Sequence, residues 1–235
     1  MLNRRHIRIK ILQLLYSKTT GKIDNKSLLK QFELTTQNFY KLFLTQLILL
    51  KEIFNESERV IDLNEKKYFK QDSQSIKKLL LENQLLKSIN SDKYLVKASE
   101  KFDLYYWSNN SNKVQNIFND LVKSEVFINY SKNENLFIQH IYKNFIASND
   151  ELFDFYEECE IGWVDDFPLV NTIVLNWIIN KSIDKSVKVY RKIFKDRLDK
   201  KFGKDFERKM EKWAANFEKN AEVNSEEFEK SMEEW

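Results

Sequence analysis

The residues best suited to chemistry lie near the amino terminus of the chain. Arg4, Arg5 and Arg8 stand close together, Lys10 follows, and no carboxylate occurs in residues 1–22. A guanidinium group pairs with phosphate through two parallel hydrogen bonds and stacks on unpaired bases, so an arginine-rich helix end suits single-stranded RNA. Cations are mildly unfavourable at the positive end of a helix dipole, and a docked anion would relieve that cost. The segment therefore predicts a phosphate-binding surface.

The other residues capable of catalysis or zinc binding stand alone. His6 and His140 have no acidic or cysteine neighbours at the spacing of zinc ligands, which leaves a structural role or, for His6, a phosphate contact. The single Cys159 lies among three glutamates, whose charge should raise its pKa and suppress the nucleophilic thiolate. Serine nucleophile elbows and glycine-rich phosphate loops do not occur. We therefore expect no catalytic residue, no cofactor and no enzymatic activity.

Every charged residue in the segment 150–166 is a carboxylate. Asp154, Glu157 and Glu158 share one helical face and could bind magnesium together with Asp165 and Asp166. A hydrated helix face interleaved with buried apolar residues explains the same pattern without a metal, so we expect none. A metal-dependent nuclease that uses Asp165 and Asp166 is the least favoured reading of the chain.

The composition bounds the fold and the compartment. The 235 residues include only 3 Gly and 1 Pro, so tight turns are scarce and long helices are expected, while 42% hydrophobic residues supply a core. A single cysteine excludes an internal disulfide framework, and no apolar run is long enough to span a membrane. The prediction is an all-α cytoplasmic protein. Abundant Lys, Asn and Ile are also typical of an AT-rich genome, which makes lysines weaker evidence for anion binding than arginines.

Helical periodicity predicts the first helix over residues 3–18 and gives it two apolar strips. The first strip is Ile7, Ile11, Leu14 and Leu15, and the second is Ile9, Leu12 and Tyr16. With both strips packed against partners, only His6, Lys10 and Gln13 should form a narrow polar edge.

Further helices are predicted over 24–54, with a break at Thr35 and Thr36, and a polar loop over 55–75. The segment Asn109–Asn112 reads as a linker, and Pro168 as the start of a helix that ends near Asn180. A charged amphipathic tail should occupy residues 184–235. The remaining predicted helices cover 76–89, 97–107, 114–129, 134–147 and 150–160.

The segment from Asn3 to Tyr16 closely resembles the opening helix of the NusB family of bacterial antitermination factors, in the long form found in Bacteroidetes. In the family pattern an arginine cluster is followed by another arginine one helical turn later. A glutamine comes next, and a tyrosine follows it after two intervening residues. Similar stretches occur at Phe39–Phe43, around Trp107 and over 153–166. The positions that match the pattern of the first helix are Arg4, Arg5, Arg8, Gln13 and Tyr16.

The resemblance implies a NusB-like helical bundle that binds a boxA-like single-stranded RNA together with the ribosomal protein NusE. Such factors act with the transcription elongation complex in antitermination on ribosomal RNA transcripts. The implied RNA-binding residues are those at matching positions together with Lys10, although packing suits Tyr16 at least as well as a base contact.

One departure from the family concerns the carboxyl-terminal part of the chain. The family's closing segment of the second bundle is missing, so we expect residues 1–183 to form a NusB-like bundle with an extended middle portion. Residues 184–235 would be a charged tail, in a chain that is either truncated or divergent. The alternative function is a non-catalytic helical scaffold that docks a partner protein through Trp213 and Phe217 of the tail and needs no RNA.

Overall fold

The computed structural model describes residues 4–21, 25–65, 79–124, 134–160 and 162–179. Helices account for nearly all of these residues and no strand occurs among them, which confirms the predicted all-α helical bundle. The chain divides into two compact units, and their boundary falls between Gln37 and Asn38, inside one long helix. The predicted tail 184–235 lies outside the described residues.

The first unit contains α1 (Arg4–Gly21) and the first part of α2 (Asn25–Glu65). Ile11, Leu14 and Leu15 of α1 are buried, at the i, i+3 and i+4 spacing that the sequence predicts for the packed side of a helix. The hydroxyl of Ser17 donates to the Leu14 carbonyl at 2.8 Å. These contacts confirm the first helix and three residues of its main apolar strip, while the Ile7 side chain lies outside what the structure describes.

Helix α2 is continuous over 41 residues, so the break predicted at Thr35 and Thr36 is wrong. Each of these threonines donates its hydroxyl proton to the carbonyl four residues earlier, at 2.8 Å. This bond lets a threonine stay inside a helix, where its side chain otherwise competes with the backbone. The loop predicted from residue 55 is also wrong as far as Glu65, because α2 runs through it.

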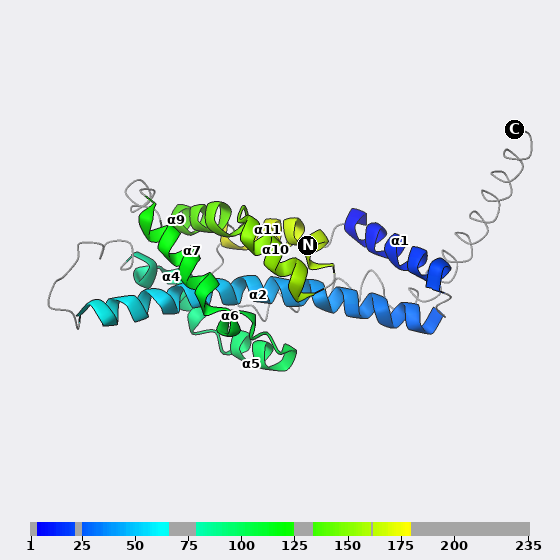
Figure 1. Ribbon diagram of the computed structural model, residues 1–235, viewed down its shortest axis with the longest axis horizontal. Coiled ribbons are helices and arrows are strands. Elements are labelled where there is room, and N and C mark those ends of the chain that lie inside the picture. Colours follow the sequence, from blue (N-terminus) through cyan, green and yellow to red (C-terminus); the bar gives the residue numbers. More distant parts are fainter. Residues whose placement is uncertain (1–3, 22–24, 66–78, 125–133, 161, 180–235) are drawn as a thin grey trace, which may run out of the picture. The chain divides into compact units, whose positions relative to one another are not determined.

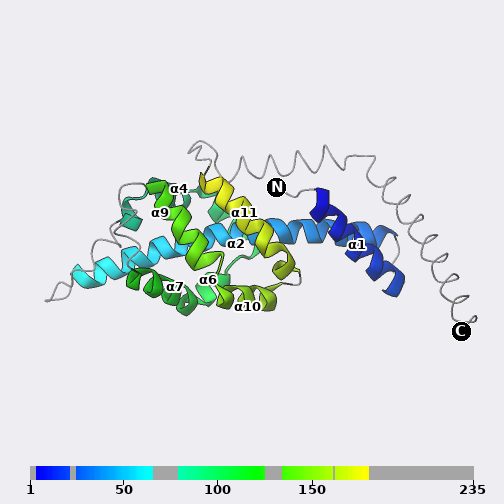
Figure 2. The same cartoon turned by 90° about the horizontal axis from the view of Figure 1, so that it is seen from above.

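The second unit is built around the remainder of α2. All nine residues from Leu42 to Leu50 are buried, on every side of the helix, as expected for a helix at the centre of a bundle. Figures 1 and 2 show the other helices of this unit arranged around α2. They are α4 (Gln84–Asn90), α5 (Lys93–Phe102), α6 (Tyr106–Asn109), α7 (Ser111–Lys123), α9 (Glu134–Ile141), the π-helix η1 (Tyr142–Ile146), α10 (Asp150–Cys159) and α11 (Trp163–Ile179).

Short polar side chains decide where several of these helices begin. Asn83, Asp92 and Asn149 are the N-caps of α4, α5 and α10, and each accepts a hydrogen bond from a backbone N–H in the first turn. Asp103 has a left-handed backbone (φ 57°) and ends α5. The single helix predicted over 97–107 is therefore α5, a turn and α6.

Several other boundaries differ from the prediction, among them the end of α7 at Lys123 and the break at Asn83 within the helix predicted over 76–89. The predicted linker at Asn109–Asn112 shrinks to Asn110, which separates α6 from α7 and donates its side-chain amide to the Tyr106 carbonyl at 2.8 Å. Helix α11 starts at Trp163, after Gly162 with φ 85°, so Pro168 lies inside the helix and does not start it. The helix predicted over 134–147 forms, but its last turn is η1.

No helix in the described ranges has the length and apolar character needed to cross a membrane.

Candidate nucleic-acid interface

One face of α1 is open to solvent. Ile9, Leu12 and Tyr16 are 42%, 54% and 66% exposed, and Gln13 beside them is exposed as well. Their spacing of three and four residues places them along one side of the helix. The prediction that Ile9, Leu12 and Tyr16 pack against partners as a second strip is therefore wrong, because only the side of α1 that bears Ile11, Leu14 and Leu15 is covered.

Lys10 lies on the covered side of α1. It is only 7% exposed, whereas its position in the sequence predicts a place on a polar edge and a phosphate contact. Its position next to the buried Ile11 and one turn before Leu14 explains the difference, since residues at this spacing share a helical side. The expected exposure of Lys10 is thus wrong, while that of Gln13 is confirmed.

Arg4, Arg5 and Arg8 belong to the first turns of α1, and their side chains lie outside what the structure describes. In the helical register Arg5 and Arg8 come four residues before Ile9 and Leu12. The 18 residues of α1 include no carboxylate. This helix combines a charge of one sign with an exposed aromatic ring.

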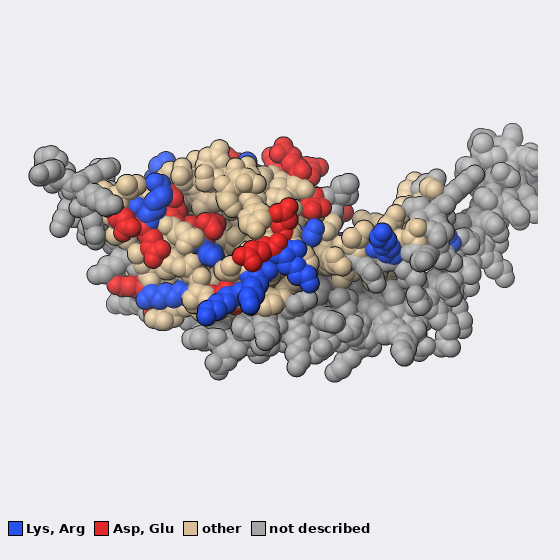
Figure 3. All heavy atoms as spheres, turned by 90° about the horizontal axis from the view of Figure 1, so that it is seen from below, with Lys and Arg blue, Asp and Glu red and all other residues tan. Residues whose placement is uncertain are grey.

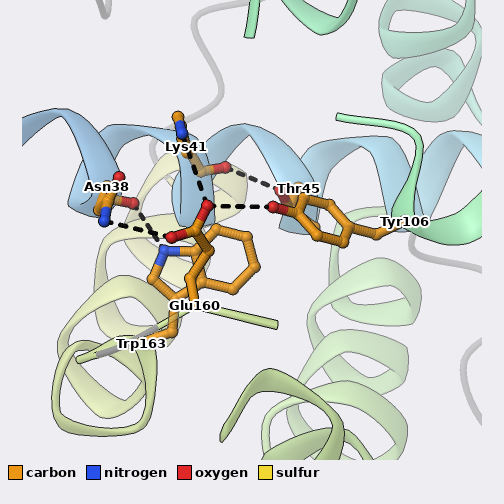
Figure 4. A network of polar contacts seen from close by, with 6 residues as sticks. All are labelled: Asn38, Lys41, Thr45, Tyr106, Glu160 and Trp163. Atoms are coloured by element: carbon orange, nitrogen blue, oxygen red, sulfur yellow. Dashed lines mark hydrogen bonds and ion pairs between the residues drawn. The ribbon is translucent and has the colours of Figure 1, made fainter. Parts of the chain in front are cut away.

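A polar junction in the second unit was not expected from the sequence, and Figure 4 shows it in detail. Glu160, directly after α10, accepts long hydrogen bonds of 3.4 Å from Asn38 Nδ2 and Tyr106 Oη, and pairs with Lys41 Nζ at 3.6 Å. The indole N–H of Trp163 donates to the Asn38 carbonyl at 2.9 Å. The junction therefore ties the α10–α11 connection to α2 and α6.

The electrostatics of this junction do not favour catalysis. Burial, helped by the charges of Glu158 and Glu160, raises the pKa of the Cys159 thiol to about 11. Burial and then Glu160 raise the pKa of Tyr106 to about 12. The sequence correctly predicts that the pKa of Cys159 is raised. The largest cause of this rise is burial, and the charge of the glutamates comes second. Both groups keep their protons near neutral pH, so neither is an activated nucleophile or base.

Most carboxylates of the acidic segment described by the structure lie at the surface. Asp154, Glu157, Glu158 and Asp165 are exposed, whereas Asp166 is buried. Within the described ranges, no group of three histidine, cysteine or carboxylate side chains lies close enough to hold a metal ion. His140 lies beside Asn144 of its own helical segment, and burial, followed by the charge of Lys143, lowers its pKa.

A second buried polar cluster joins three helices of the bundle. Asn171 Oδ1 accepts from Tyr142 Oη at 2.9 Å and from Gln46 Nε2 at 3.4 Å, and Asn171 Nδ2 donates to the Ala147 carbonyl at 3.4 Å. Within the part of the chain that the structure describes, Gln46 Oε1 and the Tyr156 hydroxyl have no hydrogen-bond partner. Tyr142 opens η1, so the cluster lies at the place where the helical geometry changes. No local sequence signal predicts it, since its partners are far apart along the chain.

We expect the buried hydroxyls and the thiol to make the protein sensitive to alkali. The pKa values of Tyr142 and Tyr156 are raised well above 10 by burial, and those of Cys159 and Tyr106 lie at about 11 and 12. These groups hold their protons more tightly in the folded protein than in the unfolded chain. Their contribution to the free energy of unfolding is therefore fully present below the unfolded pKa values and is lost as pH rises from about 9 to 12. Urea unfolding followed by circular dichroism should show this fall.

The matched variant for this prediction is Tyr156→Phe. It removes a hydroxyl that has no hydrogen-bond partner among the described residues, so the free energy of unfolding at pH 8 should not decrease. Between pH 9 and 11 this free energy should fall less steeply than that of the wild type. An identical alkaline slope in both proteins would show that Tyr156 does not contribute to the transition.

Comparison with known proteins gives no further guide: no protein-family model, no curated protein and no solved structure matches the chain.

Proposed function

We propose that the protein is a non-catalytic RNA-binding factor, similar to NusB, that acts in transcription antitermination on ribosomal RNA transcripts in the cytoplasm. Its ligand is a boxA-like single-stranded RNA, and its partners are the ribosomal protein NusE and the transcription elongation complex. The observation that carries this proposal is the open face of α1, on which Tyr16 is 66% exposed in a helix without any carboxylate.

Each part of the α1 face suits one part of an RNA strand. The ring of Tyr16 offers a surface on which an unpaired base stacks, and the Gln13 amide can donate to and accept from base edges. The arginines at positions 4, 5 and 8 supply phosphate contacts at the amino-terminal end, where the helix dipole favours an anion. Lys10 is left out of this contact set because it is buried.

The test is binding of the whole chain to a labelled boxA-like strand and to a scrambled strand across a salt series. The variant Arg4→Glu/Arg5→Glu should lose at least about tenfold in affinity at low salt, because phosphate contacts release counterions and dominate the binding free energy. The variant Lys87→Glu/Lys143→Glu makes the same change in net charge at exposed positions of the second unit and should bind nearly as the wild type does.

Tyr16 provides a second arm of the same experiment. Tyr16→Ala should weaken binding by a factor that corresponds to about 1–3 kcal/mol of base stacking, whereas Tyr16→Phe should retain most of the affinity. Equal and weak binding to both strands, unchanged in the arginine variant, would overturn the proposal.

A helical scaffold is the alternative, and the exposed apolar side chains of Ile9 and Leu12 favour it. An apolar strip on a helix suits a protein partner as well as it suits a base. The two functions differ in their response to substitution. Partner capture by a scaffold should survive charge reversal at Arg4 and Arg5 and be lost in Leu12→Asp, and no preference among RNA strands should be measurable.

A further inference from the structure

Helix α5 of the second unit presents a row of lysines to solvent. Lys93, Lys97 and Lys101 are all exposed and follow one another at intervals of four residues, which advance along a helix by about 6 Å per step. Leu95, on the opposite side, and Ala98 are the residues by which α5 is buried. The packing of α5 thus turns the three ammonium groups outward along one flank of the helix.

The three ammonium groups have few partners in the part of the chain that the structure describes. Among the described residues, no carboxylate lies within ion-pair distance of Lys93, Lys97 or Lys101. Lys93 is the first residue of α5, where the helix dipole disfavours a cation. Lys101 Nζ lies 5.6 Å from the centre of the Phe102 ring. The row is therefore available to an external anion.

The row has a defined border. Glu100, three residues after Lys97, and Asp103, the C-cap of the helix, are exposed acidic residues at the edge of the row. Figure 3 looks at the side of the molecule on which α5 lies in Figure 1, and it shows a row of blue side chains with red ones along one edge. An extended anion would follow the row and avoid the acidic edge.

An aromatic ring stands just beyond the carboxyl-terminal end of the row. After the left-handed turn at Asp103, the buried Leu104 anchors the chain, and Tyr105 is 44% exposed. By contrast, the hydroxyl of Tyr94 lies 3.4 Å from that of Tyr40, which holds this tyrosine against α2. A basic track beside an exposed aromatic ring is the arrangement by which proteins bind single strands without reading their sequence.

We propose that α5 is a second contact surface for single-stranded RNA, with backbone phosphates along Lys93, Lys97 and Lys101 and a base stacked on Tyr105. The inference rests on the proposed function and adds to it a sequence-independent contact with RNA outside the boxA-like element. Lysines act here as flexible point charges, so they suit a backbone whose position varies and give no preference for one base over another.

The experiment uses the whole chain and a boxA-like element extended by a uridine tract, with the element alone for comparison. The variant Lys93→Gln/Lys97→Gln/Lys101→Gln should bind the extended strand at least about tenfold more weakly, with the slope of log affinity against log salt reduced by about 2, as expected for three lost phosphate contacts. Binding to the element alone should change little. Tyr105→Ala should weaken binding to the extended strand, and Tyr105→Phe should not.

The matched control is Lys87→Gln/Lys123→Gln/Lys143→Gln, which removes the same charge from exposed positions on α4, α7 and η1. An equal loss in both triple variants would show a general charge effect and overturn the inference. A normal response to Arg4→Glu/Arg5→Glu, with no effect of the α5 triple variant, would overturn the α5 surface alone and leave the proposed function in place.

Two further outcomes separate the remaining readings. Absence of RNA binding by the wild type would overturn the proposed function and this inference together. Binding of the wild type to vesicles of anionic phospholipid that is lost in the α5 triple variant, with RNA affinity unchanged, would assign the lysine row to a lipid surface and overturn RNA as its ligand.

Discussion

Trp107→Ala is expected to lower the free energy of unfolding by about 3–5 kcal/mol, as for other fully buried aromatic residues that leave a cavity. Trp107 is buried at the centre of the second unit. Its indole N–H donates to the Thr45 carbonyl of α2 at 2.9 Å, and its ring packs against Phe155 at 5.2 Å and Tyr156 at 5.9 Å between centroids. The ring therefore joins α6 to both α2 and α10, and alanine removes all of these contacts.

Urea unfolding followed by circular dichroism measures this loss. Trp107→Phe keeps an aromatic ring but loses the indole N–H, so it should cost less than the alanine variant. Tyr105→Ala, two residues away and 44% exposed, is the matched control and should change stability by less than about 1 kcal/mol. A loss below about 1 kcal/mol in Trp107→Ala would contradict the packing described for this ring.

Asn171→Ala is expected to destabilise the protein by about 3 kcal/mol. The change removes the acceptor shared by Tyr142 and Gln46, and each buried polar group left without a partner costs about 1–3 kcal/mol. Gln46 would then have neither amide atom paired, because its Oε1 already has no partner. The effect should be large because Gln46 and Tyr142 are fully buried and cannot exchange the lost bond for water.

A double-mutant cycle isolates the hydrogen bond between Asn171 and Tyr142. Tyr142→Phe alone should cost about 1 kcal/mol, since it removes one neutral hydrogen bond. The same change in the Asn171→Ala background should cost nothing or stabilise, because the hydroxyl is then unpaired, and the coupling between the two sites should reach about 1 kcal/mol or more. Purely additive effects would sink the assignment of this bond.

These variants also bear on how function is tested. Trp107, Asn171 and Tyr142 act within the core of the second unit, so their replacement should change the free energy of unfolding. Gln13 and Tyr16 of α1 and the lysines of α5 are exposed, and replacing them should leave stability within about 1 kcal/mol of the wild type. A loss of RNA binding in these exposed variants can therefore be read as a loss of contact and not of fold.

Local patterns in the sequence were sufficient for the class of fold and for much of the helix map. The scarcity of glycine and proline predicts long helices, and the spacing of Ile11, Leu14 and Leu15 predicts the covered side of α1. The helix predicted over 150–160 forms as α10. Such predictions succeed because helical periodicity and capping depend on residues within a few positions of one another.

Helix boundaries were harder to predict at residue types that occur both inside helices and at their ends. Threonines disfavour a helix interior in isolation, yet Thr35 and Thr36 bond to carbonyls of their own helix and α2 continues. A proline often begins a helix, yet α11 accommodates Pro168 in its interior. In both cases the packing of the whole helix overrides a local preference that is worth little by itself.

For the candidate site, the sequence alone determined that a carboxylate-free helix with arginines at its start opens the chain, that Gln13 and Tyr16 follow at helical spacing, and that Cys159 resists ionisation. Only the tertiary structure decided that Tyr16 is exposed and Lys10 is buried, and that α5 turns three lysines outward. It also decided that Asn171 and Glu160 join helices that are distant in the sequence. The physical reason is that periodicity shows which residues share a helical side, whereas the covering of that side depends on contacts from elsewhere in the chain.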